Sequence, residues 1–198
     1  MYGCSAPRIV GVALAATLVL TPRASADVDK PAEGTGDTFE DPGGGAPNVP
    51  STQSTNLDLT RHEVRHGKKI TLKSRYTDLT KPAEGDTFGV ITYVKVKGSG
   101  DEIFLSAYAT HKDPDGKTLL QRRGSNVDCR GLKATLDYND DTITTIVPRS
   151  CLGTPEWLRY HSHAHLYLRA GSQYLYDSAG TSSTSWDDLD FSGKLRKG

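Results

Sequence analysis

Alternation of apolar and polar residues dominates the chain from Leu57 onward and is the feature that most restricts its fold. In the segment 69–76, Ile70, Leu72 and Tyr76 alternate with lysine, threonine and arginine. A period of two places apolar side chains on one face of a β-strand and polar side chains on the other. No stretch shows a sustained 3.6-residue period bounded by helix caps. The chain is therefore predicted to be all-β.

The alternating segments are short, and residues that favour turns separate them. Short strands at this spacing predict an antiparallel β-sandwich of about seven to nine strands, jelly-roll or immunoglobulin-like in outline. The predicted strands are 57–66, 69–76, 88–96, 102–110, 117–121, 130–138, 142–147 and 157–168, with 174–177 and 185–191 as candidate edge strands. The predicted core consists of Ile70, Leu72, Val90, Val94, Ile103, Leu105, Leu132, Leu136, Ile143, Val147 and Leu158.

Two cysteines flank the clearest hairpin of the sequence. If Asn139-Asp140-Asp141 forms a three-residue turn, Cys129 lies opposite Cys151 on the paired strand. Directly opposed residues are within reach of a disulfide. The same register puts Leu136 beside Thr144, so either both faces of the hairpin are partly buried or a bulge shifts the pairing by one residue. The sequence predicts a Cys129–Cys151 disulfide.

The first 26 residues have the pattern of a secretory signal peptide. Arg8 precedes the apolar run 9–20, and Ala24-Ser25-Ala26 provides the small-residue cleavage site. Residues 27–56 are rich in proline, glycine, serine and threonine and are predicted to be a disordered tether. The β-sandwich domain is then 57–198. We expect a secreted, extracellular protein with no membrane span after cleavage, in a compartment where disulfides form.

The charge of the mature chain restricts the partners it can have. The full chain has 24 Lys+Arg and 24 Asp+Glu, and removal of Arg8 and Arg23 leaves 24 − 2 = 22 basic residues against 24 acidic ones. Proteins that bind nucleic acid carry a clustered basic footprint, and electrostatic membrane binders carry one as well. The near-neutral balance argues against both classes of partner.

Three alternating histidines are the strongest candidate for metal chemistry. His161, His163 and His165 point to one face if 157–168 is a strand. The outer two would be roughly 13 Å apart at about 3.3 Å per residue, whereas zinc–nitrogen bonds are about 2 Å long. A zinc site would therefore use two of the three histidines and recruit another residue. The alternative is that the histidines form a polar outer face; no other cofactor is predicted.

The same strand face offers a candidate ligand-binding surface. Trp157, Arg159 and Tyr167 share it with the histidines. Planar rings on a sandwich face hold saccharides in many binding modules, by apolar contact with polar groups at the ring edges. The alternative for Trp157 is that it covers the core or the disulfide, as tryptophan does in many sandwiches.

Three segments together are similar to a known group of proteins. They are 59–79, 129–136 followed by 141–143, and 147–159, the last with the sequence VPRSCLGTPEWLR. They resemble small secreted β-rich proteins of unassigned function from high-GC Gram-positive bacteria. The resemblance covers most of 57–170 and implies a signal peptide followed by one β-rich domain with a single disulfide. It carries over no catalytic residue.

The sequence favours a secreted, non-catalytic module that binds an extracellular ligand, either polymeric saccharide or a protein surface. A metal-binding protein or metal-dependent enzyme that uses His161, His163 and His165 is the first alternative. A structural protein of the cell envelope is the second. No nucleophile elbow, phosphate loop or dinucleotide fingerprint occurs in the chain.

Overall fold

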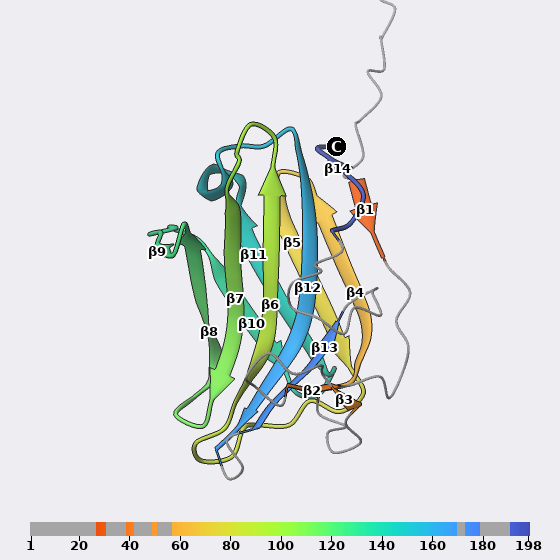
Figure 1. Cartoon of the computed structure of the whole chain (residues 1–198), viewed down its shortest axis with the longest axis vertical. Coiled ribbons are helices and arrows are strands. Elements are labelled where there is room, and N and C mark those ends of the chain that lie inside the picture. Colours follow the sequence, from red (N-terminus) through yellow and green to blue (C-terminus); the bar gives the residue numbers. More distant parts are fainter. Residues whose placement is uncertain (1–26, 31–38, 42–48, 51–56, 170–172, 179–190) are drawn as a thin grey trace, which may run out of the picture.

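The computed structural model describes residues 27–30, 39–41, 49–50, 57–169, 173–178 and 191–198. These residues form two antiparallel sheets that pack face to face, which confirms the predicted all-β sandwich (Figure 1). Nine of the described strands have five or more residues. Within the described ranges, no helix has the length and apolar character that a membrane crossing requires.

The first sheet, here sheet A, has five strands in the order β1-β4-β5-β11-β10. Their bounds are β1 (Asp27–Asp29), β4 (Leu59–His66), β5 (Lys69–Tyr76), β11 (Thr142–Pro148) and β10 (Lys133–Asp137). In β5 every second residue is buried, from Ile70 to Tyr76. The period of two in the sequence therefore corresponds to one dry and one wet face.

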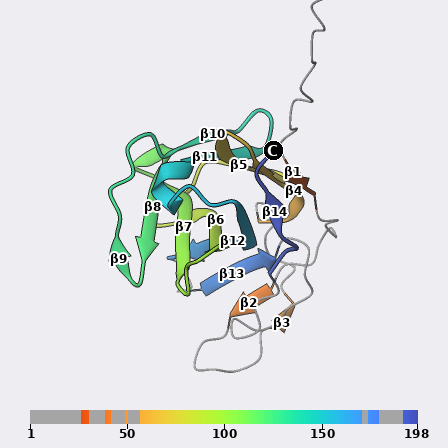
Figure 2. The same ribbon diagram turned by 90° about the horizontal axis from the view of Figure 1, so that it is seen from above.

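The second sheet, sheet B, follows the order β3-β2-β13-β12-β6-β7-β8-β9, with β14 paired to β12 outside this path. Its longer strands are β13 (Gln173–Ser178), β12 (Trp157–Leu168), β6 (Thr87–Val96), β7 (Glu102–Thr110) and β8 (Asp113–Arg122). Its short strands are β3 (Val49–Pro50), β2 (Phe39–Asp41), β9 (Ser125–Asn126) and β14 (Leu195–Arg196). Figure 2 shows β10, β11 and β5 on one side of the interior and β7, β6 and β12 on the other.

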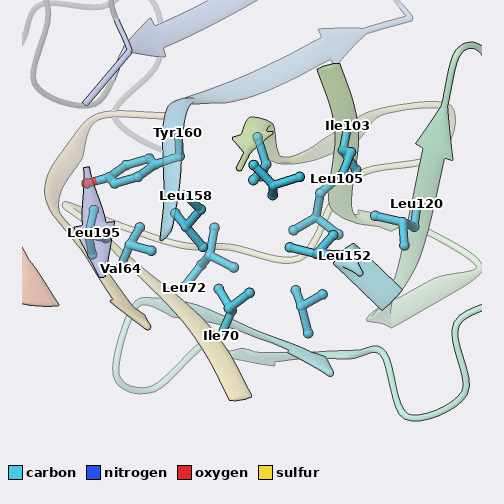
Figure 3. Packing of buried hydrophobic residues seen from close by; sticks show 13 residues of the cluster. Val64, Ile70, Leu72, Ile103, Leu105, Leu120, Leu152, Leu158, Tyr160 and Leu195 are labelled. Carbon is cyan, nitrogen blue, oxygen red and sulfur yellow. The ribbon is translucent and has the colours of Figure 1, made fainter. Parts of the chain in front are cut away.

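The interior consists of two apolar clusters. One is built around Leu59, Phe88, Ile143 and Leu166, and the other around Leu72, Val94, Leu105 and Leu158 (Figure 3). Every residue of the predicted core is buried except Leu132 and Leu136, which are half-buried and pack against the clusters. The alternation pattern thus identified the inward-facing side of each main strand.

The disulfide forms as predicted, but the register of its hairpin differs. Cys129 and Cys151 are bonded, with their Cα atoms 5.5 Å apart. Leu136 lies opposite Ile143, not Thr144, so the pairing is shifted by one residue and the loop has four residues, 138–141. The cysteines lie beyond the paired strands, Cys151 in the 3-10 helix η1 (Arg149–Leu152). The shift places Leu136 and Ile143 on the same inner face, which removes the conflict in the expected register.

The segment predicted as a disordered tether contains three short strands, β1, β2 and β3. Strand β1 pairs with β4, and both of its carboxylates accept hydrogen bonds. Asp27 Oδ2 accepts from Arg196 N at 2.9 Å, and Asp29 Oδ2 accepts from Tyr160 Oη at 2.9 Å. These partners are more than 100 residues away, so local composition did not reveal them. The rest of 27–56, the signal-peptide pattern 1–26 and most of the candidate strand 185–191 lie outside the described residues.

Loss of the disulfide should destabilise the domain without changing its fold. The bridge closes a loop with a sequence separation of 22. Chain entropy then predicts that the C129S/C151S variant loses roughly 3 kcal/mol in the free energy of unfolding. Urea unfolding followed by circular dichroism measures this loss, and reduction of the wild-type protein should reproduce it. A reactive thiol in the oxidised wild-type protein, or equal stability of the two proteins, would contradict the prediction.

Candidate functional site

The outer face of β12 carries all six residues predicted for ligand or metal binding. The inner residues Leu158, Tyr160 and Leu166 belong to the core clusters, so the odd-numbered residues point away from sheet A. The face assignment from sequence alternation is therefore correct. The six side chains do not form the one shared binding site that the sequence analysis expected, because they differ in burial and in position along the strand.

The three histidines are buried and do not form a polar surface exposed to water. His161, His163 and His165 are 3%, 1% and 5% exposed. The His163 ring lies 5.9 Å from the Tyr93 ring and 6.5 Å from the Tyr176 ring, measured between centroids. The ring centroids of Phe191 and His161 are 6.5 Å apart. Aromatic neighbours on several sides thus remove the imidazoles from solvent.

The burial of the histidines determines their charge. Burial lowers the pKa of His165 to about 4. Burial also lowers the pKa of His163 well below its ordinary value, with smaller contributions from His165 and His161. At neutral pH both imidazoles are therefore uncharged.

The histidines do not gather a metal-binding group within the described part of the chain. The rings of His161 and His163 are 5.9 Å apart between centroids. Among the described residues, no three His, Cys, Asp or Glu side chains are placed to share a metal ion. The third ligand that a zinc site would have to recruit is thus not among them.

The predicted saccharide residues lie at separate places on β12. Trp157 is half-buried, with Lys194 Nζ 4.9 Å from its ring centroid. Tyr167 is half-buried against Tyr174, with ring centroids 5.5 Å apart. Trp157 and Tyr167 are ten residues apart, or about 33 Å along an extended strand. Arg159 is exposed near the tryptophan end. The structure therefore does not bring the three residues together into one site.

A more continuous apolar surface lies beside the histidines, on the outer faces of β6, β7 and β8. We call it the aromatic face. Its members are half-buried and point away from sheet A: Ile91, Tyr93, Phe104, Tyr108 and Leu119. Half-buried rings on an open sheet keep part of their flat surface in contact with water. This is the arrangement that a planar apolar ligand surface can cover.

The register aligns these residues in rows across the sheet. Tyr93 lies opposite Phe104, and Phe104 lies opposite Gln121. The rings of Tyr93 and Phe104 meet edge to face, with centroids 5.6 Å apart. Two rows away on the same face, Tyr108 lies opposite Gly89, where an added Cβ would be 2.1 Å from the carbonyl oxygen of Ala107. The close approach of the two strands at Gly89 therefore excludes any side chain beside Tyr108.

Polar groups border the aromatic face. Gln121 Nε2 donates to Asn126 Oδ1 at 2.9 Å, at the β9 side. Burial raises the pKa of Tyr93, and nearby Glu102 adds to this rise, so the phenol keeps its proton at neutral pH. Neutral hydroxyl and amide groups around apolar rings can make hydrogen bonds in an orientation that the rings help to set.

Sequence reasoning missed the aromatic face, although a signal for it was present. In 88–96, Ile91 and Tyr93 occupy the positions between the core residues Val90 and Val94, so both faces of the strand are apolar. A strand that is apolar on both faces is either covered on both sides or carries an exposed apolar surface. On the paired strand β7, Phe104 lies opposite Tyr93 and points outward as well.

A hydrogen-bonded serine–histidine pair lies in the interior of the sandwich. His62 Nδ1 is 2.9 Å from Ser74 Oγ, and the two residues are 0% and 1% exposed. Burial, with a smaller contribution from His161, lowers the pKa of His62 to about 4. In this conformation no substrate can reach the pair. Its hydrogen bond gives Ser74 Oγ and His62 Nδ1 a partner across β4 and β5.

No protein-family model, curated protein or solved structure matches this chain.

The buried histidines should make the stability of the domain fall as the pH is lowered from 7 to 5. Unfolded histidine has a pKa near 6.5, whereas His62 and His165 have folded-state pKa values of about 4. Between these values the unfolded state binds more protons than the folded state, so the free energy of unfolding decreases with falling pH. The expected loss is roughly 2 kcal/mol for each of the two residues, measured by urea unfolding at each pH.

Replacement of one buried histidine should reduce this pH dependence. The H165Q variant should lose stability less steeply between pH 7 and 5 than the wild-type protein, because one of the groups that protonate on unfolding is absent. His111 is exposed, and H111Q is the matched control that should leave the slope unchanged. Stability that is constant over this pH range, or an equal effect of the two variants, would contradict the prediction.

Proposed function

We propose that the protein is a secreted, non-catalytic β-sandwich module that binds polymeric saccharide outside the cell through the aromatic face. The observation that supports this proposal most directly is the row formed by Tyr93 and Phe104 on an open sheet, with Tyr108 four residues further along β7 on the same outer face. All three rings are half-buried and belong to the central strands of sheet B. Rigid central strands hold the rings in a fixed arrangement.

The chemistry of a saccharide matches this surface. One face of a sugar ring presents C–H groups that pack on an aromatic ring, while its hydroxyls point to the sides and form hydrogen bonds. Gln121 at one end of the row and Lys117, which lies opposite Tyr108, supply polar groups at the border. A flat sheet face has no closed cavity and so accommodates a segment within a long chain as readily as its end.

Export of the protein is part of the same proposal. The pattern Arg8, 9–20 and Ala24-Ser25-Ala26 supports a cleaved signal peptide. The Cys129–Cys151 bond is consistent with an oxidising compartment, since disulfides are rare in the cytosol.

Removal of one ring from the aromatic face should weaken saccharide binding. We expect Y93A and F104A each to reduce retention on insoluble polysaccharide about tenfold, equivalent to ~1.4 kcal/mol. Each substitution removes apolar contact area at the centre of the surface. Pull-down with a panel of insoluble glycans, quantified by depletion of the soluble protein, measures the effect. Thermal unfolding of each variant establishes that the fold is retained.

Two control variants make this test specific. Tyr108→Phe keeps the ring and should bind like the wild-type protein. Tyr174→Ala removes an aromatic side chain that is 43% exposed on β13, outside the aromatic face, and should also leave binding intact. A loss confined to Trp157→Ala or Y174A would move the site to β12 or β13. The proposal is overturned if no glycan retains the folded protein.

A further inference from the structure

The outer face of sheet A, on the opposite side of the sandwich, concentrates positive charge. We call this surface the basic face. Its cations are exposed and lie on β4, β5 and β10: Arg61, Arg65, Lys69, Lys73, Arg75 and Lys133. The carboxylates on the outer faces of the same strands are those of Glu63 and Asp137. A chain with equal numbers of acidic and basic residues thus places six of its 24 cations on one surface.

Neighbouring charges on the basic face are poorly neutralised. Glu63 contacts Lys30, Arg61 and Arg65, at 3.3, 3.8 and 3.1 Å. Asp137 Oδ1 accepts hydrogen bonds from the main-chain N–H groups of its own hairpin loop, at 139 and 140. Within the described part of the chain, no carboxylate forms an ion pair with Lys73 or Arg75. Several cations of this surface therefore have no anionic partner among the described residues.

Two arginines oppose each other directly on this face. Arg61 on β4 pairs in register with Arg75 on β5. Directly opposed residues have Cβ atoms about 4.5–5.5 Å apart, and like charges in this position destabilise a sheet. An anion that binds between the two guanidinium groups would remove this repulsion. The placement is therefore unfavourable for the free protein and favourable for a complex with an anion.

The surface between these strands is hollowed. A depression of about 210 Å³ is lined by Arg61, Glu63, Lys73 and Arg75. Three of the four lining residues are cations, and two of them are arginines whose planar donor groups match the oxygens of a tetrahedral anion. The depression can hold a sulfate or phosphate group. The carboxylate of Glu63 also lines the depression and repels anions. A bound anionic group is therefore expected to lie against the two arginines and away from Glu63.

The arrangement of cations favours a linear polymer over a single small anion. Residues two apart on a strand are about 6.8 Å apart, and neighbouring strands are about 4.8 Å apart. The cations of β4 and β5 thus form a grid that can contact successive charged groups of one chain. Among the described outer-face residues of sheet A, none is aromatic, and single-stranded nucleic acids bind surfaces on which bases stack.

We propose that the basic face binds a linear polysaccharide that carries sulfate or phosphate esters, with an ester group seated between Arg61 and Arg75. This is a second binding surface, distinct in chemistry and position from the aromatic face. Binding is driven by ion pairing and counterion release, so it weakens as the salt concentration rises.

The test measures binding of heparin, a sulfated polysaccharide, by isothermal titration calorimetry and by elution from a heparin column. At about 0.15 M NaCl, the dissociation constant of R61Q/R75Q should be at least about tenfold weaker than that of the wild-type protein. The slope of log K against log [NaCl] should decrease in magnitude by about 2. R61K/R75K keeps both charges and should keep the wild-type slope.

The matched control is K112Q/R130Q, which removes two exposed cations outside the basic face. It should bind heparin within about twofold of the wild-type protein. K69Q/K73Q provides a second pair within the basic face and should weaken binding in the same direction as R61Q/R75Q. Equal losses in K112Q/R130Q and R61Q/R75Q, or absence of heparin binding by the wild-type protein, would overturn the proposal.

Two further measurements distinguish this proposal from binding of nucleic acid and from binding through the aromatic face. Tighter binding of a single-stranded oligonucleotide than of heparin would overturn the assignment to a polysaccharide. Y93A should bind heparin like the wild-type protein, because Tyr93 lies on the other sheet. Failure of the aromatic face to bind neutral glycans would therefore leave the heparin result unchanged, and an equal loss of heparin binding in Y93A would count against the basic face.

Discussion

Strand β12 is the element on which both layers depend. It pairs with β6 along most of its length, with β13 at one end and with β14 at the other. Its inner residues Leu158 and Leu166 belong to different core clusters, so it links the two halves of the interior. Its outer residues 161, 163 and 165 are buried as well. Strands buried on both faces are usually apolar throughout, and imidazole can take such a place only as the neutral form.

A band of polar side chains separates the two apolar clusters. Hydrogen bonds within each sheet join its members: His62 Nδ1 lies 2.9 Å from Ser74 Oγ in sheet A, and Thr92 Oγ1 lies 2.9 Å from Ser162 Oγ in sheet B. All four residues are at most 1% exposed. A slip of one residue in either strand pair would leave buried polar atoms against apolar neighbours, which costs free energy. The polar band therefore helps to fix the strand register.

The inward faces could be predicted from sequence, because a period of two is a local property. Strands β5, β7 and β12 match their predicted ranges to within a residue, and the Cys129–Cys151 pairing was correct. Features that depend on distant contacts were not predictable in this way. The hairpin loop 138–141 has one residue more than its turn signal indicated, and β1 is held by partners near the other end of the chain. The outer face of β12 was identified, but the aromatic face beside it was missed. Alternation cannot distinguish a covered outer position, such as His163, from a partly open one, such as Tyr93.

The two outer faces of the sandwich have opposite chemistry, and their geometry bears on how they could act together. Packed sheets are about 10 Å apart, and their outer faces point in opposite directions. A ligand on the aromatic face therefore cannot contact Arg61 or Arg75, and occupation of one face does not block the other. A module built in this way could hold a neutral and an anionic polymer at the same time. Saccharide binding and a structural role in the cell envelope would then be two descriptions of one activity, the non-covalent bridging of two polymers by a small rigid domain.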